Sequence, residues 1–525
     1  MMSSGMVTSP HPLASAAGAK VLERGGNAIE AAVAMGGVLT VVCPHFCGLG
    51  GDAVWMIADG AGNADCILGL GQAAAAVKAS GPIPLRGPGS AITTAGAVAA
   101  WEKALDHSTR CWAGEITLGD LLTPAAELAA AGFPVTKAQA FWLDFRADEI
   151  GEWPGFSDLF KPGHVTPAPG DRFRQPQLAT SLEAIMRGGA REFYEGDLAH
   201  RLAKEFGALG TPITHDDLAA TQARDVKPLT VDYRGVTLHG PPPPTQGLAT
   251  LMTMGILDQF DAGKWREETP AHFHHVIEAI KRAFLERDAI ADPDFASLDT
   301  TRLLSREWLA EQTASIDPAR ALSWPHEYRT GDTVYFGAVD RLGNCASVLQ
   351  STYFDWGSGI VVGDTGIIWN NRGAAFSTDA SHPNSLVPGK RPFHTLNPGL
   401  ATRNGRPFLL YGTQGADGQP QTLALLLTRL IDFGLDPAEA LKRPRFLLGK
   451  TFSDARDSLK IEVDAGEQTL KKLAALGHDL SRLPPQSPLA GQAGAIMIDN
   501  DTVSGAHDPR GEGCAIFSGG GRPGT

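Results

Sequence analysis

A threonine at the start of an expected strand could supply an unusual nucleophile. The stretch YRTGDTVYFGAVDRLGN, residues 328–344, reads as a loop followed by a β-hairpin, and Thr333 opens the first strand. If the chain were cut before Thr333, a free α-amine would lie beside its hydroxyl. An α-amine has a pKa of about 7.7–8.0, so it could act as the general base at neutral pH. The alternative is a purely structural residue, because β-branched side chains favour strands.

The same hydroxyl could make the cut. Its oxygen would attack the carbonyl carbon of Asp332, and hydrolysis of the resulting ester would release Thr333 as a new N-terminus. Gly331 would give the backbone the freedom that this attack requires. Residues 316–332 contain two prolines and mixed charge without sustained periodicity. We therefore expect an exposed loop that can move away after the cut.

Two other motifs could indicate a cofactor or a metal. CGLGGDA, residues 47–53, has the spacing of a dinucleotide-binding loop, but that motif must lead into a helix and the next residues read as a strand. We interpret it as a tight glycine turn. His274 and Glu278 lie one turn apart in an expected helix, without a second group of ligands. The sequence thus predicts neither a cofactor nor a metal.

The composition is that of a large globular protein. Of 525 residues, 43% are hydrophobic and 20% are charged. The net charge of −13 and the lack of basic runs argue against nucleic acid as a partner. The sequence shows neither a long apolar span nor a secretory signal, so we expect no membrane association and a cytoplasmic location. The six scattered cysteines suit reduced thiols better than a disulfide framework.

The threonine stands where the character of the chain changes. The first part reads as helix-rich, with two helices within 13–42 and others at 117–131, 177–188, 196–208 and 270–291. After residue 332 short strands are expected in TVYFGAVD, CASVLQSTYF, TGIIWNN, RPFLLYGT and GAIMID, with helices at 420–433, 436–442 and 466–476. Stacked sheets covered by helix layers would satisfy both parts, so we expect one layered α/β unit.

Motifs along nearly the whole chain resemble the γ-glutamyltransferase family of N-terminal-nucleophile hydrolases. They include HPLASAAGAKVLERGGNAIEAAVA, PHFCGLGGD, PPPPTQG, HHVIEAIKRAFLERDAIADPDF, TVYFGAVDRLGN and GKRPFHTLNPGL, in the family's order. The resemblance implies a four-layer αββα sandwich and a proenzyme that cleaves itself. The matching cut lies between Asp332 and Thr333. It would give a large subunit, 1–332, and a small subunit, 333–525, that form a heterodimer; a dimer of heterodimers is left open.

The resemblance also implies roles for residues around the nucleophile. Ser351, in LQSTYF, matches a second hydroxyl that hydrogen-bonds the nucleophile, where threonine is usual. Gly415 and Ala416, in YGTQGADG, match the pair of backbone N–H groups that form the oxyanion hole. Alanine replaces the second glycine there. Because the donors are backbone N–H groups, the side chain does not matter as long as alanine can adopt the φ angle that the loop requires.

The sequence departs from the family pattern at the positions that bind the α-ammonium and α-carboxylate groups of a γ-glutamyl substrate. An ammonium needs an acidic partner, but the matching position here is Ala375, in NNRGAAFS. The family's asparagine after the helper hydroxyl falls at Tyr353, and its paired serines fall at His394 and Thr395. The family's carboxylate-binding arginine should fall in residues 72–84, which contain none.

Arg372, in the same NNRG segment, offers a different cation, which could pair with a substrate carboxylate through two parallel hydrogen bonds. A structural salt bridge is the alternative. The pattern is similar to the oxamate amidohydrolase branch of the family. We therefore expect a hydrolase of a small, carboxylate-bearing amide such as oxamate. The alternatives are a γ-glutamyltransferase or glutathione hydrolase, a cephalosporin-acylase-like enzyme, and a non-enzymatic relative.

Overall fold

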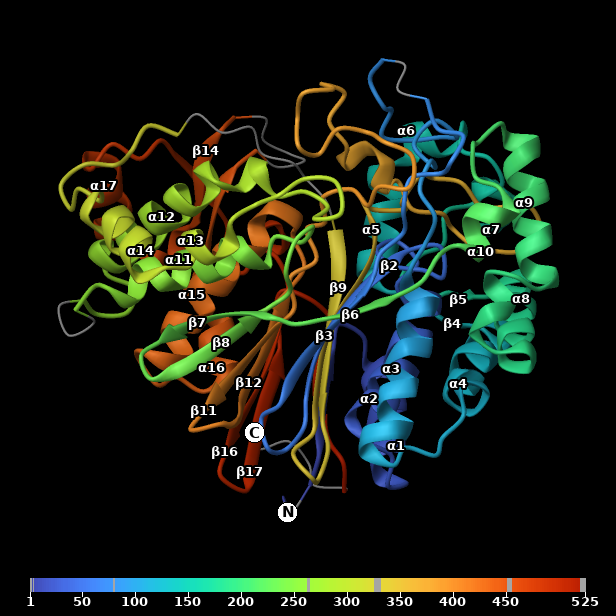
Figure 1. Ribbon diagram of the computed structural model, residues 1–525, viewed down its shortest axis with the longest axis horizontal. Helices are drawn as coiled ribbons and strands as arrows, with labels where there is room; N and C mark the ends of the chain where they lie inside the picture. The colour runs from blue at the N-terminus through green and yellow to red at the C-terminus, as the bar shows by residue number, and fades with distance from the viewer. Residues whose placement is uncertain are drawn as a thin grey trace.

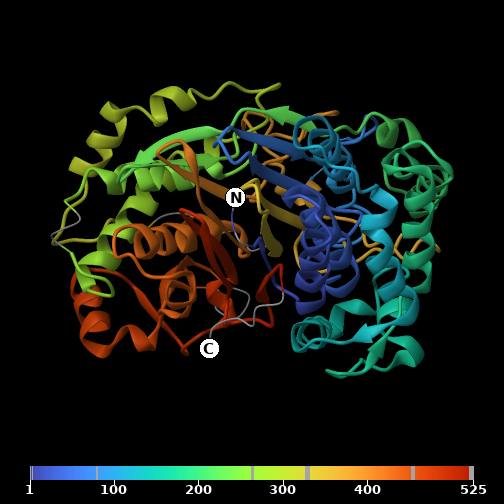
Figure 2. The same ribbon diagram turned by 90° about the horizontal axis from the view of Figure 1, so that it is seen from below.

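Two antiparallel sheets lie face to face at the centre of the protein, and helices cover each outer face (Figure 1). The structure, a computed structural model, describes residues 2, 4–78, 81–261, 265–324, 332–450 and 456–519. From below, blue and teal helices lie on one side and the orange and red elements on the other (Figure 2). This order of layers is the expected αββα sandwich.

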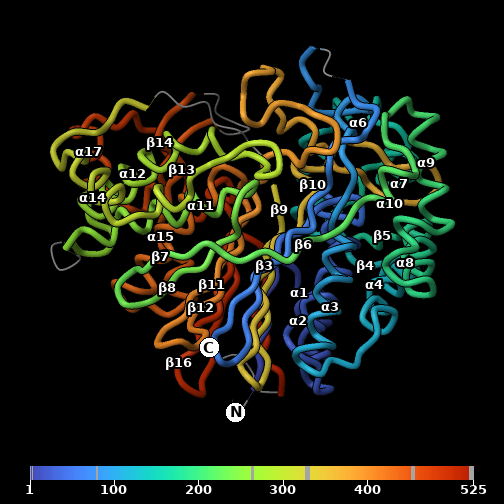
Figure 3. The backbone as a smooth tube through the Cα atoms, viewed as in Figure 1, coloured from blue at the N-terminus to red at the C-terminus, as the bar shows by residue number. Residues whose placement is uncertain are grey.

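The first sheet has seven strands and carries Thr333 near its middle. Thr333 is the second residue of β9, which runs between β1 and β10 beside the blue strands of the N-terminal part (Figure 3). In order across the sheet, the strands are β18 (Cys514–Phe517), β1 (Met6–Ser9), β9 (Asp332–Val339), β10 (Cys345–Tyr353), β2 (Asp52–Ala58), β3 (Ala64–Gly69) and β6 (Arg224–Val226).

The second sheet has six strands, and it too mixes chain from before and after residue 332. The two expected subunits therefore form one folded body. In order, its strands are β17 (Thr502–His507), β16 (Ala493–Asp499), β12 (Arg406–Thr413), β11 (Gly399–Arg403), β8 (Val236–Gly240) and β7 (Leu229–Tyr233). Smaller sheets are formed by β13 (Phe446–Gly449), β14 (Ser458–Glu462) and β15 (Leu480–Leu483), and by β4 (Phe133–Pro134) and β5 (Arg172–Phe173).

Helices form the two outer layers. On the side of the first sheet they are α1 (Pro12–Glu23), α2 (Ala28–Val42), α3 (Ala97–Trp112), α4 (Leu118–Ala131), α5 (Lys137–Phe145), α6 (Ala147–Ile150), α7 (Phe156–Phe160), α8 (Pro176–Gly188), α9 (Asp197–Leu209) and α10 (His215–Ala219). On the side of the second sheet they are α11 (Gly247–Asp258), α12 (Pro270–Leu285), α13 (Thr300–Leu303), α14 (Arg306–Ala314), α15 (Gln419–Ile431), α16 (Pro437–Lys442) and α17 (Glu467–Ala475). A capping box formed by Asn27 and Glu30 begins α2, whose fifteen residues are all buried.

Alternation along β9 decides which way Thr333 faces. Val334 and Phe336 pack into the core shared with the first helix layer. Tyr335 packs into the core between the two sheets. Because successive side chains of a strand point to opposite faces, the Thr333 side chain belongs to the face between the sheets.

Two local expectations are corrected. TGIIWNN, residues 365–371, forms no strand: Ile368 and Trp369 make only isolated bridges. The side chains of Asn370 and Asn371 bind loop carbonyls there, so the backbone follows those loops instead of a neighbouring strand. The helix expected over 270–291 ends at Leu285.

Other features of the sequence can be placed in the fold. The expected loop at 316–332 is mostly exposed up to residue 324, and residues 325–331 lie outside the described part of the chain. The six cysteines are free thiols, and four of them are buried. None of the described helices combines the length and hydropathy that crossing a bilayer requires.

Candidate active site

Thr333 lies opposite an irregularity in the neighbouring strand. Asp332 pairs with Tyr353 and Val334 pairs with Gln350, so two residues of β10 face one residue of β9. Such a β-bulge re-aims side chains beside functional sites. Thr333 is 1% exposed, and its Oγ1 has no hydrogen-bond partner among the residues that the structure describes. A buried hydroxyl without a partner costs free energy, so this one is a candidate for chemistry.

Ser351, within the bulge, contacts the peptide bond that precedes Thr333. Its Oγ donates a hydrogen bond of 2.6 Å to the carbonyl oxygen of Asp332 and accepts one of 2.8 Å from the N–H of Tyr353. The second bond orients the hydroxyl for the first. A donor on the Asp332 carbonyl oxygen would stabilise the negative charge that develops there when the carbon is attacked.

Replacing Ser351 with alanine should slow self-cleavage about 10²-fold, because one donor to the developing oxyanion is lost. The time course of precursor loss on a denaturing gel, begun immediately after refolding, measures this rate. Ser351→Thr is the matched control and should retain most of it, because the hydroxyl remains. Cleavage of Ser351→Ala at the wild-type rate would show that this hydrogen bond has no part in the reaction.

The Asp332 side chain is itself buried, 6% exposed, and its Oδ2 has no hydrogen-bond partner in the described ranges. Burial, and secondarily the negative charge of Asp355, raises the pKa of this carboxyl to about 8. The uncut chain therefore holds Asp332 in its neutral form at neutral pH.

This protonation predicts a pH dependence of stability in the uncut chain. Between about pH 4 and pH 8 Asp332 ionises in the unfolded chain but keeps its proton in the folded chain. Folding stability should therefore fall as the pH rises through this window, by up to about 1.4 kcal/mol per pH unit. Denaturant unfolding of Thr333→Ala, which keeps the chain intact, should show the slope, and Thr333→Ala/Asp332→Asn should show less of it. Parallel pH profiles for the two proteins would contradict the assignment.

The expected oxyanion residues lie between β12 and α15. Gly415 has φ 115° and Ala416 has φ 43°. The alanine thus occupies the left-handed region, at a cost of roughly 1 kcal/mol. Its N–H belongs to the first turn of a 3₁₀ helix, where amides lack acceptors within the helix. Gln246 fixes this loop, because its Nε2 donates to the carbonyl oxygens of Ala416 and Thr395, at 2.7 Å each.

Arg372 is a fully buried cation, and none of its three guanidinium nitrogens makes a hydrogen bond within the described part of the chain. Its guanidinium lies 4.1 Å from the centre of the Tyr353 ring, and its Nε lies 3.7 Å from Oδ2 of Asp52. Burial lowers the pKa of Arg372, and the negative Asp52 opposes that effect. Five buried N–H donors without acceptors are costly unless an anion completes the site.

Asp52 connects this cation with His394 and is a residue that the sequence did not single out. His394 Nε2 lies 3.2 Å from Asp52 Oδ2. The other Asp52 oxygen accepts hydrogen bonds from the backbone N–H groups of Gly71 and Gly96. Burial, followed by the positive charge of Arg372, lowers the pKa of His394, and the hydrogen bonds with Asp52 and with the Pro392 carbonyl oxygen oppose that effect. The sequence could have indicated Asp52 by its place in the chain. It is the last residue of the CGLGGD turn, and the strand expected after that turn begins there.

At the position that matches the family's acidic residue, Ala375 has no side-chain carboxylate to offer an ammonium. Ala375 packs with Tyr353 and Phe354 in a small apolar cluster. Arg86, the arginine nearest in sequence to residues 72–84, is bound to Asp355, with its Nη2 3.1 Å from Oδ2. It therefore does not replace the missing carboxylate-binding arginine.

His274 and Glu278 meet His478 in the fold, and their potential ligand atoms lie within 4.8 Å of one another. Glu278 is an ion-pair partner of both Lys281 and Arg282. His274 Nδ1 lies 2.9 Å from His478 Nε2. These contacts use the atoms that a metal would need, so we interpret the group as a structural network.

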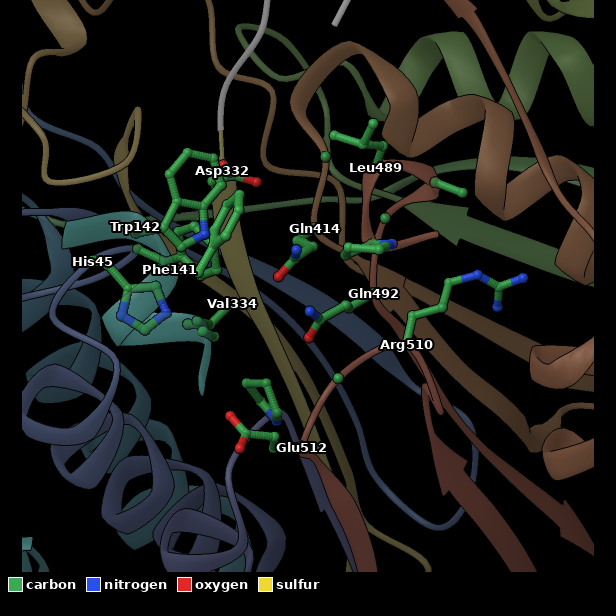
Figure 4. A pocket seen from close by; sticks show the side chains of 18 of the residues that line it. His45, Phe141, Trp142, Asp332, Val334, Gln414, Leu489, Gln492, Arg510 and Glu512 are labelled. Atoms are coloured by element: carbon green, nitrogen blue, oxygen red, sulfur yellow. The ribbon is translucent and has the colours of Figure 1, made fainter. Parts of the chain in front are cut away.

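A cavity of about 600 Å³ lies beside the start of β9. Asp332 and Val334 line it from the strand, and Trp142 approaches from α5 (Figure 4). Gln414 and Gln492 line the opposite side, next to the oxyanion loop (Figure 4). The cavity thus touches both neighbours of Thr333 and the loop that would bind the oxyanion.

Comparisons with known proteins agree with this geometry. Residues 14–518 match the family described as Gamma-glutamyltranspeptidase. The oxamate amidohydrolase proenzyme of Klebsiella pneumoniae subsp. pneumoniae is 43% identical over 519 residues, covering 97% of this chain and 98% of that protein. The glutathione hydrolase-like YwrD proenzyme of Bacillus subtilis is 38% identical over 525 residues, with 97% and 98% covered. The crystal structure of cephalosporin acylase from Bacillus halodurans has a TM-score of 0.90 at 31% identity, with 98% of this chain and 96% of that chain covered.

The sandwich, the hydroxyl that opens a central strand and these similarities define an amidohydrolase of the N-terminal-nucleophile type. The chain belongs to the gamma-glutamyltranspeptidase family.

Proposed function

We propose that the protein is a self-processing amidohydrolase whose nucleophile is Thr333 and whose substrate is a small amide that carries a carboxylate, as oxamate does. The cut lies between Asp332 and Thr333 and gives subunits 1–332 and 333–525, which remain together as a heterodimer. The names of the Klebsiella and Bacillus relatives, both described as proenzymes, support processing. The Klebsiella relative also supports an oxamate-like substrate.

In the processed enzyme, the α-amine of Thr333 takes the proton from its own hydroxyl as Oγ1 attacks the substrate carbonyl. The N–H groups of Gly415 and Ala416 hold the oxyanion. The amine then gives the proton to the departing nitrogen, and water hydrolyses the ester on Thr333. Ser351, freed from the Asp332 carbonyl by the cut, can hydrogen-bond the nucleophile.

The observation that carries the substrate class is the buried guanidinium of Arg372. Its nitrogens lack hydrogen bonds while its face is fixed on the Tyr353 ring. A carboxylate can accept two parallel hydrogen bonds from such a group, and these are strong when water is excluded. His394 and Thr395 are buried near this site and would position the same anion.

Ammonia release from oxamate, set beside chromophore release from a γ-glutamyl anilide, tests this assignment. We expect a higher kcat/KM with oxamate, because the position that would bind an α-ammonium is Ala375 in an apolar cluster. A higher kcat/KM with the γ-glutamyl compound would favour a glutathione hydrolase and overturn the argument.

A further inference from the structure

The cavity beside β9 is far larger than oxamate requires. Its volume of about 600 Å³ lies within the range of about 300–1,000 Å³ that is usual for pockets holding drug-sized ligands. Oxamate has only a carboxylate and a primary amide. The cavity therefore has room for a part of the substrate that the site at Arg372 does not hold.

Aromatic side chains of α5 form one wall of this cavity. Trp142 makes edge contacts with Phe141 and Phe145, each with ring centres 5.4 Å apart, and Phe141 stacks on Phe145 at 5.8 Å. Phe141 is 57% exposed and Phe145 is 41% exposed. Exposed aromatic side chains that gather at the mouth of a cavity mark a binding surface, and rings of this kind favour flat, apolar partners.

Two histidines that line the cavity, His11 and His45, are neutral at neutral pH. Burial lowers the pKa of His11 to about 4. Burial, with a smaller effect of His11, lowers the pKa of His45 to about 3. Asp332 keeps its proton in the uncut chain and becomes the end of the large subunit once the chain is cut.

The cations among the described lining residues are already engaged or face solvent. Arg510 is paired with Glu462, with Nε 2.9 Å from Oε1. Lys137 is exposed at the start of α5, and Glu512 accepts a hydrogen bond from its backbone N–H. Among its described lining residues, the cavity thus has no counterpart of Arg372, a fully buried guanidinium whose nitrogens make no hydrogen bond. Its chemistry suits the uncharged part of a substrate.

The amine that Thr333 would acquire lies between two residues whose side chains line this cavity. β1 pairs with β9 over Gly337–Val339, so residues 332–336 have no strand partner on that edge within the described chain. His11, which follows β1, lines the cavity along this open edge. The nitrogen of Thr333 is flanked by Asp332 and Val334, which both line the cavity. The hydroxyl belongs to the opposite face of the strand.

The two faces of β9 would hold different parts of an amide substrate, the acyl group on one side and the leaving amine on the other. The amine of Thr333 must give its proton to the departing nitrogen, so the leaving group departs on the side of the amine. The carboxylate of the acyl part is directed to Arg372. Ser351 and Asp52 are paired across β10 and β2, so their side chains share one face, and Asp52 contacts Arg372.

We propose that the substrate is an N-substituted amide, in which a short carboxylate-bearing acyl group binds at Arg372 and an aromatic amine occupies the cavity walled by Phe141 and Trp142. This inference rests on the proposed function. Oγ1 of Thr333 bonds to the acyl carbon and the C–N bond breaks. The hydroxyl proton passes through the α-amine to the nitrogen, which leaves as a neutral aromatic amine. Water then hydrolyses the ester and releases the dicarboxylic acid.

Oxamate and its N-phenyl derivative, oxanilate, test this with the processed enzyme, by release of ammonia and of aniline. We expect kcat/KM for oxanilate to exceed that for oxamate at least about 10-fold. Trp142→Ala and Phe141→Ala should each lower the ratio of the two values roughly 10- to 100-fold. Phe141 is exposed, so its variant keeps the test valid if Trp142→Ala misfolds. Phe295→Ala, which removes a 46% exposed aromatic residue outside the cavity, should leave the ratio unchanged.

The outcomes separate this inference from the proposed function. Hydrolysis of oxamate with no preference for oxanilate, or an unchanged ratio in both α5 variants, would overturn the aromatic leaving-group site while the proposed function stands. Processed enzyme that hydrolyses neither compound would contradict the proposed function itself.

Discussion

Thr333→Ala is expected to leave the chain as a single 525-residue polypeptide and to lower amide hydrolysis by at least about 10⁴-fold. One substitution removes both activities because one hydroxyl serves both reactions: it attacks the Asp332 carbonyl first and the substrate carbonyl afterwards. A denaturing gel and the hydrolysis rate measure the two effects on the same preparation. The burial of Thr333 without a hydrogen-bond partner is the structural reason to expect so large a loss.

Thr333→Ser is the matched control, since it keeps the hydroxyl and removes one methyl group. It should cleave itself and turn over substrate, at reduced rates. Two bands from Thr333→Ala would place the nucleophile of self-cleavage elsewhere. Full-length Thr333→Ala with wild-type turnover would show that catalysis needs neither the cut nor this hydroxyl.

We expect Arg372→Met to lower catalytic activity while the protein still folds. Self-cleavage should continue, while kcat/KM for oxamate should fall about 10²- to 10³-fold, because two charge-assisted hydrogen bonds to the substrate are lost. The free energy of unfolding without substrate should fall by well under about 3 kcal/mol, because the guanidinium makes no hydrogen bond within the described chain and Asp52, which loses a cation 3.7 Å away, keeps its hydrogen bonds from Gly71 and Gly96. Denaturant unfolding and steady-state kinetics provide the two readouts.

Arg429→Met is the control for a buried arginine whose bonds are satisfied. Arg429 lies 2.7 Å from Glu267 and donates to the Pro444 carbonyl oxygen at 2.6 Å. Its loss should lower the free energy of unfolding by about 3 kcal/mol, because its partners are left without it. If Arg372→Met were equally destabilising, Arg372 would be a structural residue and the anion site would be contradicted.

Thr333 could be proposed as the nucleophile from sequence because motifs along the whole chain point to one loop-to-strand boundary. Thr333 lies at a loop-to-strand boundary within a long series of motifs, and the structure places it on β9 beside Ser351. Apolar periodicity marks most elements, which predicted a layered α/β unit, and the resemblance to the family implied the αββα order of the layers. The wrong strand at 365–371 had the right periodicity, but side chains of two asparagines tie its backbone to other loops.

The surroundings of the nucleophile were less accessible from sequence. Arg372 was identified as a cation, but its lack of hydrogen bonds depends on what every neighbouring side chain does in the fold. Asp52 comes to lie opposite Ser351 only when β2 pairs with β10 in the folded protein. The cavity joins α5, the start of β9 and residues 484–492, which are far apart in sequence, so no local pattern could reveal it.

The most direct test of the account is to sequence the N-terminus of the smaller fragment in purified wild-type protein. We predict two fragments that copurify, with the smaller beginning Thr-Val-Tyr-Phe, because the bond between Asp332 and Thr333 is the one that Ser351 polarises. A single full-length chain that stays uncut on incubation would contradict the central claim, and so would a fragment that begins at any other residue.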